Sequence, residues 1–370
     1  MSWLDHGSSS FFMALTLYQL SEKIFELEKQ GKKILRLNIG DPGLVTSDAL
    51  RDAAKRSLDA GETRYASAQG EKPLLDKIAS IHGAEAQNVS VTPGSKWACY
   101  AVLQLMLKPG DNIVTPAPFW SAYELMAKSF GAECRLVKTK MEDHFQFDPQ
   151  ALFELVDSKT KVIVLNDPSN PTSTEYSLES VKAVLEFAQD QKILVLLDEA
   201  YRDLSFKRNN LQPYSKGLAI TTTFSKAYCM SGWRAGYLVA GTELIKKVVS
   251  LNQITFTNIP RFTQAAMLEG LKRREEVTGV TRAECQKRLE ACEKIFDGIP
   301  YARPDSGFYF FPKVGDGDAI TEKILDQGIA VTPGSVFGGY KQFIRLSLSH
   351  PLEKLTPALQ TIRRVIDDHA

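Results

Sequence analysis

Short apolar runs alternate with longer amphipathic stretches along most of this chain. From about residue 88 onward, brief runs rich in Val, Ile and Leu predict strands at Val89–Thr92, Ile113–Pro116, Cys134–Val137, Val162–Leu165, Ile193–Asp198, Thr221–Phe224 and Gly236–Ala240. Apolar residues at helical spacing predict helices between them, at Trp97–Leu107, Ser121–Phe130, Leu178–Asp190 and Leu244–Leu251. Continuously apolar strands that alternate with helices indicate an α/β fold with a mostly parallel sheet covered on both faces.

The two ends of the chain differ from this pattern. Apolar residues between positions 17 and 27 recur at helical spacing, and Ile34–Asn38 predicts a short strand. After about residue 265, the pattern predicts a long charged helix at Gln264–Ile295, then strands at Gly307–Phe311 and Phe343–Ser349 that flank another helix. These elements indicate a second, smaller domain, as expected for 370 residues, because a single core stops growing at roughly 250–300 residues.

Composition excludes several classes of partner. Lys plus Arg number 45 against 44 Asp plus Glu, which argues against a nucleic acid or an anionic membrane as the main partner. The five cysteines are scattered and the five histidines lack ligand spacing, so we expect neither a disulfide framework nor a metal site. The apolar patch Phe11–Leu17 has no basic flank before it and no cleavage site after it, so it predicts packing surface. We therefore expect a cytoplasmic protein.

Asp198 is the most informative polar residue, because it ends the apolar run Ile193–Leu197. Its carboxylate is predicted at the carboxyl edge of a buried strand, where an ionised group is costly unless a cation or several donors meet it. Asp is also favoured as a helix N-cap. From this residue alone, the capping and the functional interpretations are equally supported.

Lys226 follows the predicted strand Thr221–Phe224, and a lone lysine there is usually a solvated surface group. Its neighbours change that expectation. Arg234 lies between Gly232 and Gly236 in the segment Ser-Gly-Trp-Arg-Ala-Gly, and glycine lets backbone approach closely. The hydroxyls of Thr223 and Ser225 together with this guanidinium suit a phosphate group.

Two further turns follow predicted strands. Thr92-Pro93-Gly94-Ser95-Lys96 joins a strand to a helix, so free N–H groups and the helix dipole would favour an anion, although such junctions are common without a ligand. The segment Asn-Asp-Pro-Ser-Asn-Pro-Thr at 166–172 forms a rigid turn by composition alone. That interpretation leaves the Asn170 amide unused, and an amide there could donate to an oxygen anion.

Taken together, these motifs resemble the class I and II aminotransferases of the fold-type-I pyridoxal-phosphate enzymes, from about Leu37 to Ser349. The segment Thr-Phe-Ser-Lys-Ala-Tyr-Cys-Met-Ser-Gly-Trp-Arg-Ala-Gly at 223–236 is similar to the family's cofactor-attachment signature. The motifs come closest to the prokaryotic aspartate and aromatic aminotransferases. The resemblance implies an aspartate-aminotransferase-like fold, with a seven-stranded-type sheet in a large domain and a smaller α+β domain. The boundaries predicted are 1–45 for an N-terminal arm and part of the small domain, 46–270 for the large cofactor-binding domain and 271–370 for the small C-terminal domain.

The resemblance also implies roles at the cofactor. Lys226 would hold pyridoxal 5′-phosphate as a Schiff base and then carry the proton, Asp198 would pair with the pyridine nitrogen, and Tyr201 and Asn170 would bond the ring oxygen. The phosphate would be bound by a set of residues around two turns, Gly94, Ser95, Thr223 and Arg234, and Lys96 would be a further cofactor-binding residue. Lys96 also matches a lysine that contacts acidic substrate side chains in some relatives, while a solvated helix residue is its simpler interpretation.

Other residues match the family's contacts to the ring, the partner and the substrate. Trp120 matches the aromatic that stacks on the pyridine ring, although it or Phe119 could equally belong to the core. Tyr65 resembles the tyrosine that reaches a neighbouring subunit's phosphate, which implies a homodimer with shared active sites. Arg345 and Gly40 match the two sides of the α-carboxylate site, but strand alternation alone would also allow Arg345 to point outward.

Three positions depart from the family pattern: Ser173 replaces a glycine, Thr223 stands where Ser or Gly is usual, and Cys229 replaces a small or aliphatic residue. None removes a group that transamination needs. We therefore predict transfer of an amino group from an L-amino acid, of the aspartate or aromatic type, to a 2-oxo acid such as 2-oxoglutarate. Alternatives are a C–S lyase, a decarboxylase or an aminocyclopropane-carboxylate-synthase-like enzyme of the same fold. A non-catalytic module that senses pyridoxal phosphate would need a DNA-binding segment, for which the family match leaves no room.

Overall fold

The computed structural model describes residues 15–207 and 212–369. A seven-stranded sheet forms its largest layer, with the spatial order β2-β8-β7-β6-β5-β3-β4. Its strands are β2 Val89–Thr92, β3 Asn112–Ala117, β4 Glu133–Lys138, β5 Thr160–Asn166, β6 Leu194–Asp198, β7 Leu218–Thr223 and β8 Gly236–Val239. Only β8 runs antiparallel to its neighbours in this sheet, so the predicted mostly parallel α/β architecture is confirmed.

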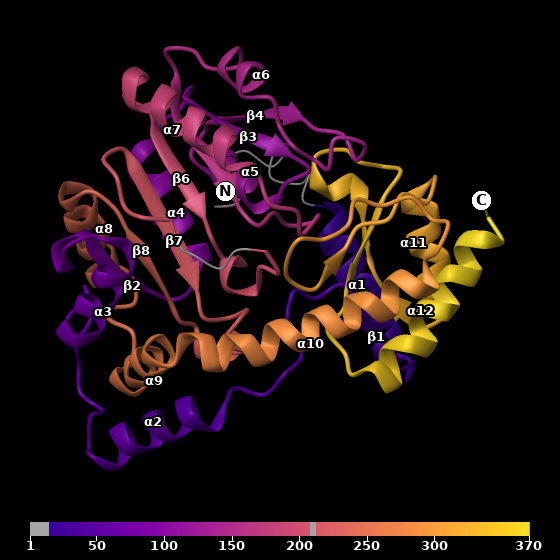
Figure 1. Cartoon of the computed structure of the whole chain (residues 1–370), viewed down its shortest axis with the longest axis horizontal. Coiled ribbons are helices and arrows are strands. Elements are labelled where there is room, and N and C mark those ends of the chain that lie inside the picture. The colour runs from indigo at the N-terminus through magenta and orange to yellow at the C-terminus, as the bar shows by residue number, and fades with distance from the viewer. Residues whose placement is uncertain (1–14, 208–211, 370) are drawn as a thin grey trace, which may run out of the picture.

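Helices cover both faces of this sheet (Figure 1). The helices of this part are α2 Asp48–Asp59, α3 Lys72–His82, α4 Ser95–Met106, α5 Ala122–Ser129, α6 Pro149–Phe153, α7 Leu178–Gln191, α8 Thr242–Thr255 and α9 Arg261–Lys272. Among them, α2 packs on α9 and not on the sheet itself (Figure 1). Strand β5 shows why two layers form. Ile163 and Leu165 pack in the cluster that holds the buried face of α7, whereas Val162 and Val164 pack in the cluster of α4, α5 and α8. Because side chains alternate along a strand, an entirely apolar strand buries both of its faces.

A smaller set of elements comes mainly from the chain after residue 273. It contains α10 Arg274–Ile295, α11 Gly317–Asp326 and α12 Leu352–Asp367, the antiparallel sheet of β9 Tyr309–Phe310, β11 Thr332–Pro333 and β12 Ile344–Ser347, and the parallel pair β1 Leu35–Arg36 and β10 Ile329–Ala330. Helix α10 runs from the large sheet to these elements (Figure 1). The N-terminal helix α1 Leu15–Lys29 and β1 belong to this smaller part, since Ile24 packs against Leu325 and Ala330. The smaller domain is thus present, while its predicted boundaries stay a prediction.

One predicted element was wrong. The pattern at Gln264–Ile295 predicted a single long helix, but the chain leaves helical geometry at Arg273 and forms α9 and α10 separately. Arg274 Nε donates to Asp203 Oδ1 at 2.7 Å at the start of the new helix. A straight helix of that length would extend about 48 Å, whereas the break lets α9 pack beside the sheet and α10 cross to the smaller part. The patch Phe11–Leu17 lies outside the residues whose side chains are described.

The carboxyl ends of the parallel strands meet at one edge of the large sheet. The loops after β2, β3, β5, β6 and β7 all start from this edge, and such edges are where ligands bind in parallel α/β sheets. Among the described helices, none combines the length and apolar composition that crossing a bilayer requires.

Candidate active site

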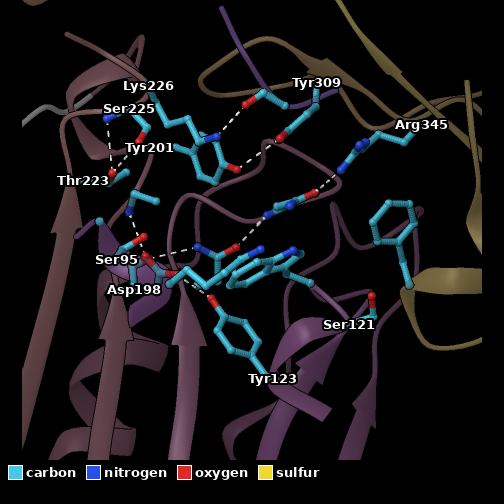
Figure 2. Close-up of a pocket in the computed structure, with 18 of the residues that line it drawn as sticks. Ser95, Ser121, Tyr123, Asp198, Tyr201, Thr223, Ser225, Lys226, Tyr309 and Arg345 are labelled. Atoms are coloured by element: carbon cyan, nitrogen blue, oxygen red, sulfur yellow. Dashed lines mark hydrogen bonds between the residues drawn. The ribbon is translucent and has the colours of Figure 1, made fainter. Parts of the chain in front are cut away.

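A cavity of about 360 Å³ opens at this edge of the sheet, between the large sheet and the smaller part of the molecule (Figure 2). It brings together twelve of the thirteen residues to which the family resemblance gives a role: Gly40, Gly94, Ser95, Lys96, Trp120, Asn170, Asp198, Tyr201, Thr223, Lys226, Arg234 and Arg345. The first and the last of these residues, Gly40 and Arg345, are more than 300 positions apart in the chain. The lining contains four basic side chains and one carboxylate, so the cavity attracts anions.

Asp198 lies at the floor of the cavity, at the end of β6, with 2% of its surface exposed. Its Oδ2 accepts hydrogen bonds from Tyr123 Oη at 2.7 Å and from Cys99 Sγ at 3.8 Å. Its Oδ1 accepts from Ala200 N at 3.1 Å. That backbone bond belongs to a turn, because the next helix is a short 3₁₀ segment at Arg202–Leu204 capped by Tyr201. The capping interpretation of Asp198 was therefore wrong.

The electrostatics of Asp198 call for a cation. Burial raises the pKa of the Asp198 carboxyl above its ordinary value, and the hydrogen bonds from Tyr123 and Ala200 only partly oppose that effect. Within the described residues, no Lys, Arg or His forms an ion pair with this carboxylate. A cationic group entering the cavity would favour the ionised form.

Lys226 reaches the cavity from the loop after β7, as predicted. Its Nζ donates to the Gly40 carbonyl at 2.5 Å and lies 5.9 Å from the centre of the Tyr201 ring. The amine is therefore held over the cavity and is not a solvated surface group (Figure 2). Gly40 presents a carbonyl to this amine, a contact that the sequence did not predict.

An anion cradle lies at one end of the cavity. Gly94, with φ +88°, precedes α4, whose first N–H groups have no partner within the helix. Thr223 Oγ1 donates to Ser225 Oγ at 2.9 Å, and both hydroxyls line the cavity. Arg234 completes the cradle and is fixed by bonds to the carbonyls of Ser231 and Pro93 at 2.8 and 3.0 Å.

Of the two glycines that flank Arg234, only Gly236 allows the close backbone approach predicted for both. A Cβ on Gly236 would lie 2.7 Å from the Gly94 backbone, so this glycine does permit a close approach of two backbones. A Cβ on Gly232 would meet nothing within 4 Å, so the expectation for Gly232 was wrong. Gly94 itself leaves room for the cradle, since a Cβ there would lie 3.1 Å from Arg234 Nη2.

Arg345 lies at the opposite end, on β12, with 7% of its surface exposed. Its guanidinium donates to Asn170 Oδ1 at 2.9 Å, to the Asn38 carbonyl at 2.7 Å and to Thr332 Oγ1 at 3.3 Å. The side chain points into the cavity, so the outward alternative was wrong. Asn170 uses its oxygen toward Arg345, which leaves its amide nitrogen as a donor.

Trp120 and Phe119 are separated by the structure. Phe119 is buried in the core beside Gly338, whereas Trp120 lines the cavity. Lys96 Nζ lies 5.2 Å from the centre of the Trp120 ring. Partial burial, with the positive charges of Arg234 and Lys226, lowers the pKa of Lys96. Lys96 is thus a cation of the cavity and not only a solvated helix residue.

Several lining residues were not predicted from the sequence, above all Tyr123 and Tyr309. Tyr123 lies three residues after Trp120, and their rings are 5.2 Å apart, so its nearness to Trp120 in the sequence was a usable signal. Tyr309 sits in an entirely apolar predicted strand, where alternation gives no signal. Asn38, Ser121, Asn166, Ala200, Thr332 and Phe337 also line the cavity.

Tyr65 is the one predicted residue that does not line the cavity. Its side chain is 86% exposed in the single chain. A tyrosine in this position contributes nothing to the cavity of its own subunit.

Comparisons with known proteins agree with this geometry. The family model of aminotransferase class I and II matches residues 32–362. The aspartate aminotransferase of Thermococcus kodakarensis is 30% identical over 353 residues, which cover 95% of this chain and 93% of that protein. The aspartate/prephenate aminotransferase of Thermus thermophilus is 30% identical, with 94% of each chain covered. A solved structure of a single mutant of Thermus thermophilus aspartate aminotransferase superimposes with a TM-score of 0.89 at 28% identity, covering 97% of this chain and 99% of that chain.

The chain belongs to the class I and II aminotransferases. It is an enzyme that transfers amino groups, with amino acids and oxo acids as its classes of substrate. The family uses pyridoxal phosphate.

Proposed function

We propose that this aminotransferase binds pyridoxal 5′-phosphate covalently through Lys226 and passes an amino group from an L-amino acid to a 2-oxo acid such as 2-oxoglutarate. The observation that carries the proposal is the convergence of Lys226, Asp198 and Arg345 on one cavity. An amine, a buried carboxylate and a guanidinium are the three groups that this chemistry needs, and they come from separate segments of the chain.

The buried carboxylate fits the cofactor's ring. Asp198 has hydrogen-bond donors from Tyr123 and Ala200 but no basic side chain paired with it in the described chain. A protonated pyridine nitrogen would supply the missing cation and would keep Asp198 ionised. Trp120, at the wall of the cavity, is the aromatic side chain proposed to stack on the ring.

The anion cradle fits the cofactor's phosphate. Gly94, Ser95, Thr223 and Arg234 are the predicted phosphate-binding residues, and Ser225 joins them through its bond to Thr223. Together they offer the start of α4, hydroxyl donors and a guanidinium, which are favourable partners for a phosphate dianion. Lys96 adds positive charge near the same end.

When bound, the cofactor supplies an aldehyde that accepts the amino group and a ring that withdraws electrons from the reacting carbon. Lys226 Nζ is proposed to anchor that aldehyde and, when released, to move the proton to and from the substrate's Cα. Tyr201 and the amide nitrogen of Asn170 would donate to the ring oxygen. Burial raises the pKa of Tyr201 well above its ordinary value, which keeps its hydroxyl protonated as a donor.

The substrate's α-carboxylate is assigned to Arg345. Its planar guanidinium suits two parallel hydrogen bonds to a carboxylate. The bonds that it makes to Asn170 and the Asn38 carbonyl fix its plane at the cavity wall. Gly40 lies on the adjoining segment and is proposed as the backbone contact on the other side of the carboxylate.

The side chain of the amino donor is assigned to the region of Lys96 and Trp120. Within the described residues Lys96 has no carboxylate partner, so it is available to a second carboxylate on a dicarboxylic substrate. The Trp120 ring beside it suits an aromatic substrate as well. We propose aspartate-type and aromatic amino acids as the donors, and the dicarboxylic type first.

A homodimer with shared active sites is part of the proposal. Tyr65 is exposed and lies outside the cavity of its own chain, which supports a contact with a neighbouring subunit's phosphate site. The cytoplasm remains the predicted location, on the composition given above.

A half-reaction screen tests this proposal. The enzyme loaded with pyridoxal phosphate is mixed with each amino acid in the absence of any 2-oxo acid, and the cofactor's absorbance is followed. We expect stoichiometric conversion to the amine form of the cofactor, reversed by 2-oxoglutarate. Continuous turnover under these conditions, with release of ammonia or carbon dioxide, would reject transamination in favour of a lyase or a decarboxylase.

Lys96→Gln should selectively impair the reaction with dicarboxylic donors.

A further inference from the structure

Tyr309 lies between the two ends of the active-site cavity. It belongs to β9 in the smaller part of the molecule and is 2% exposed. Its hydroxyl is 3.1 Å from the Tyr201 hydroxyl, and its ring centre is 4.4 Å from the Arg345 guanidinium (Figure 2). One side chain therefore contacts a residue assigned to the cofactor and a residue assigned to the substrate.

Gly40 makes room for this hydroxyl. A Cβ on Gly40 would overlap Tyr309 Oη, and it would lie 3.6 Å from Lys226 Nζ. The φ angle of Gly40 is not in the left-handed region, so backbone conformation does not require glycine here. The space that a side chain would fill is instead taken by the tyrosine hydroxyl, close to the Lys226 amine.

Ser173 holds the backbone of Tyr309 in place through a hydrogen bond. The Ser173 hydroxyl accepts a hydrogen bond from Tyr309 N at 3.3 Å, and the Ser173 carbonyl accepts from Asp305 N at 2.9 Å. Ser173 adopts φ +57°, a conformation that glycine takes more easily. Its side chain thus offsets part of a conformational cost by satisfying a buried N–H group. The turn after β5 and strand β9 are joined at this point.

We propose that Tyr309 is a positioning residue for the reaction, whose hydroxyl orients and polarises Tyr201 and whose ring holds the plane of Arg345. The inference rests on the proposed function. If Tyr201 donates its hydrogen to the cofactor, its oxygen accepts from Tyr309, and successive hydroxyl bonds strengthen one another. The ring of Tyr309 faces the guanidinium at cation–π distance, and Phe337 faces it as well at 5.1 Å.

Two substitutions separate the hydroxyl from the ring. Tyr309→Phe keeps the ring beside Arg345 and removes only the hydroxyl. We expect the pH midpoint of the bound cofactor's absorbance to rise by roughly half a unit to one unit. Without the Tyr309 hydroxyl, Tyr201 donates a weaker hydrogen bond to the cofactor's anionic ring oxygen. The less stabilised anion then favours the protonated form of the cofactor's titrating group beside it. The dissociation constant for a substrate-like carboxylate, maleate or 3-phenylpropanoate, should stay within about twofold of wild type.

Tyr309→Leu removes the ring as well. The same carboxylate should then bind roughly threefold to thirtyfold more weakly, as expected for the loss of a desolvated cation–π contact. Tyr301→Phe is the matched control, since Tyr301 bonds Glu293 and does not line the cavity. It should leave the absorbance midpoint and the carboxylate affinity unchanged.

The outcomes are distinct. If Tyr309→Phe titrates like the Tyr301→Phe control, Tyr309 does not act on Tyr201 and the inference is overturned. It is also overturned if Tyr309→Phe weakens carboxylate binding as much as Tyr309→Leu does. Tyr309→Phe is nearly isosteric, so it decides the point even if Tyr309→Leu does not fold. A wild-type protein that forms no absorbing complex with pyridoxal phosphate would instead reject the proposed function itself.

Discussion

Tyr123 Oη donates a hydrogen bond of 2.7 Å to Asp198 Oδ2, deep in the cavity and away from solvent. Burial, together with proximity to this carboxylate, raises the pKa of Tyr123 well above its ordinary value. The tyrosine therefore stays a neutral donor, and no basic side chain in the described part of the chain forms an ion pair with Asp198. A buried carboxylate without a paired cation destabilises the folded protein, and the same carboxylate favours binding of a cationic group in the cavity.

Asp198→Asn tests this interpretation because it removes the charge and keeps the shape. We expect cofactor affinity to fall and turnover to drop by roughly 100-fold or more, as for loss of a preorganised electrostatic partner. The cofactor-free variant should unfold at the same temperature as wild type or higher, since a buried carboxyl is no longer forced to ionise. Calorimetry on both forms, with a cofactor titration, measures both effects. An active variant that is merely less stable would contradict the assignment.

Arg345→Lys should weaken substrate binding while leaving cofactor binding intact. A lysine keeps the charge but loses the planar pair of donors, so KM for the amino donor should rise roughly tenfold to a hundredfold. The matched control is Arg303→Lys, because Arg303 pairs with Glu293 outside the cavity. Steady-state kinetics with both substrates measures the change, and equal KM values in the two variants would show that Arg345 does not bind the carboxylate.

Tyr65 and Lys226 should complement each other across a dimer. Lys226→Ala and Tyr65→Ala are each expected to be inactive or weak as homodimers. In a mixed dimer, one site combines an intact Lys226 with an intact Tyr65 from the other subunit, so activity should return on mixing and subunit exchange. No recovery in a verified mixed dimer would mean that each site is complete within one chain.

We expect the titration of His82 to make the folding stability of the protein depend on pH, independently of catalysis. Burial lowers the pKa of His82 from 6.5 to about 4. The neutral ring bonds the Gln212 carbonyl and Tyr237 Oη at 2.7 and 3.1 Å. Between these pH values the unfolded chain binds the proton and the folded chain does not. The stabilisation is therefore present above about pH 6.5 and is lost as the pH falls toward 4, by on the order of 3 kcal/mol.

Urea unfolding of the cofactor-free protein at pH 5 and pH 7.5 measures that slope. His82→Gln removes the titrating group, so the difference between the two pH values should shrink relative to wild type. Parallel pH profiles for the two proteins would show that His82 does not contribute.

Much of the fold could be predicted because the apolar pattern reports burial directly. Val162 to Leu165 are all apolar since both faces of β5 are covered, and the same holds for Val195 to Leu197 of the neighbouring strand β6. The break between α9 and α10 could not be predicted, because Arg273 is neither Gly nor Pro. The ion pair of Arg274 with Asp203 at that point joins residues far apart in the chain.

The site residues also fall into those that could be predicted from the sequence and those that could not. Asp198 and Lys226 were predictable because polar residues that follow apolar strands converge at one edge of a parallel sheet. Arg234 was predictable from its place in a glycine-containing segment shortly after Lys226. Tyr309 could not be predicted, because every position from Gly307 to Phe311 is apolar, glycine or aromatic, and only the tertiary contact with Tyr201 distinguishes it. The role proposed for Tyr65 involves a second subunit, so no property of one chain decides it.

The assignment of the cofactor to Lys226 is tested most directly by the absorbance of Lys226→Ala purified in the presence of pyridoxal phosphate. We expect the visible band of the covalently attached cofactor to be absent and turnover to fall by roughly 1,000-fold or more. The control Lys246→Ala, which alters an exposed lysine on α8 paired with Glu243, should keep both. A Lys226→Ala protein with the wild-type band and normal turnover would contradict the assignment.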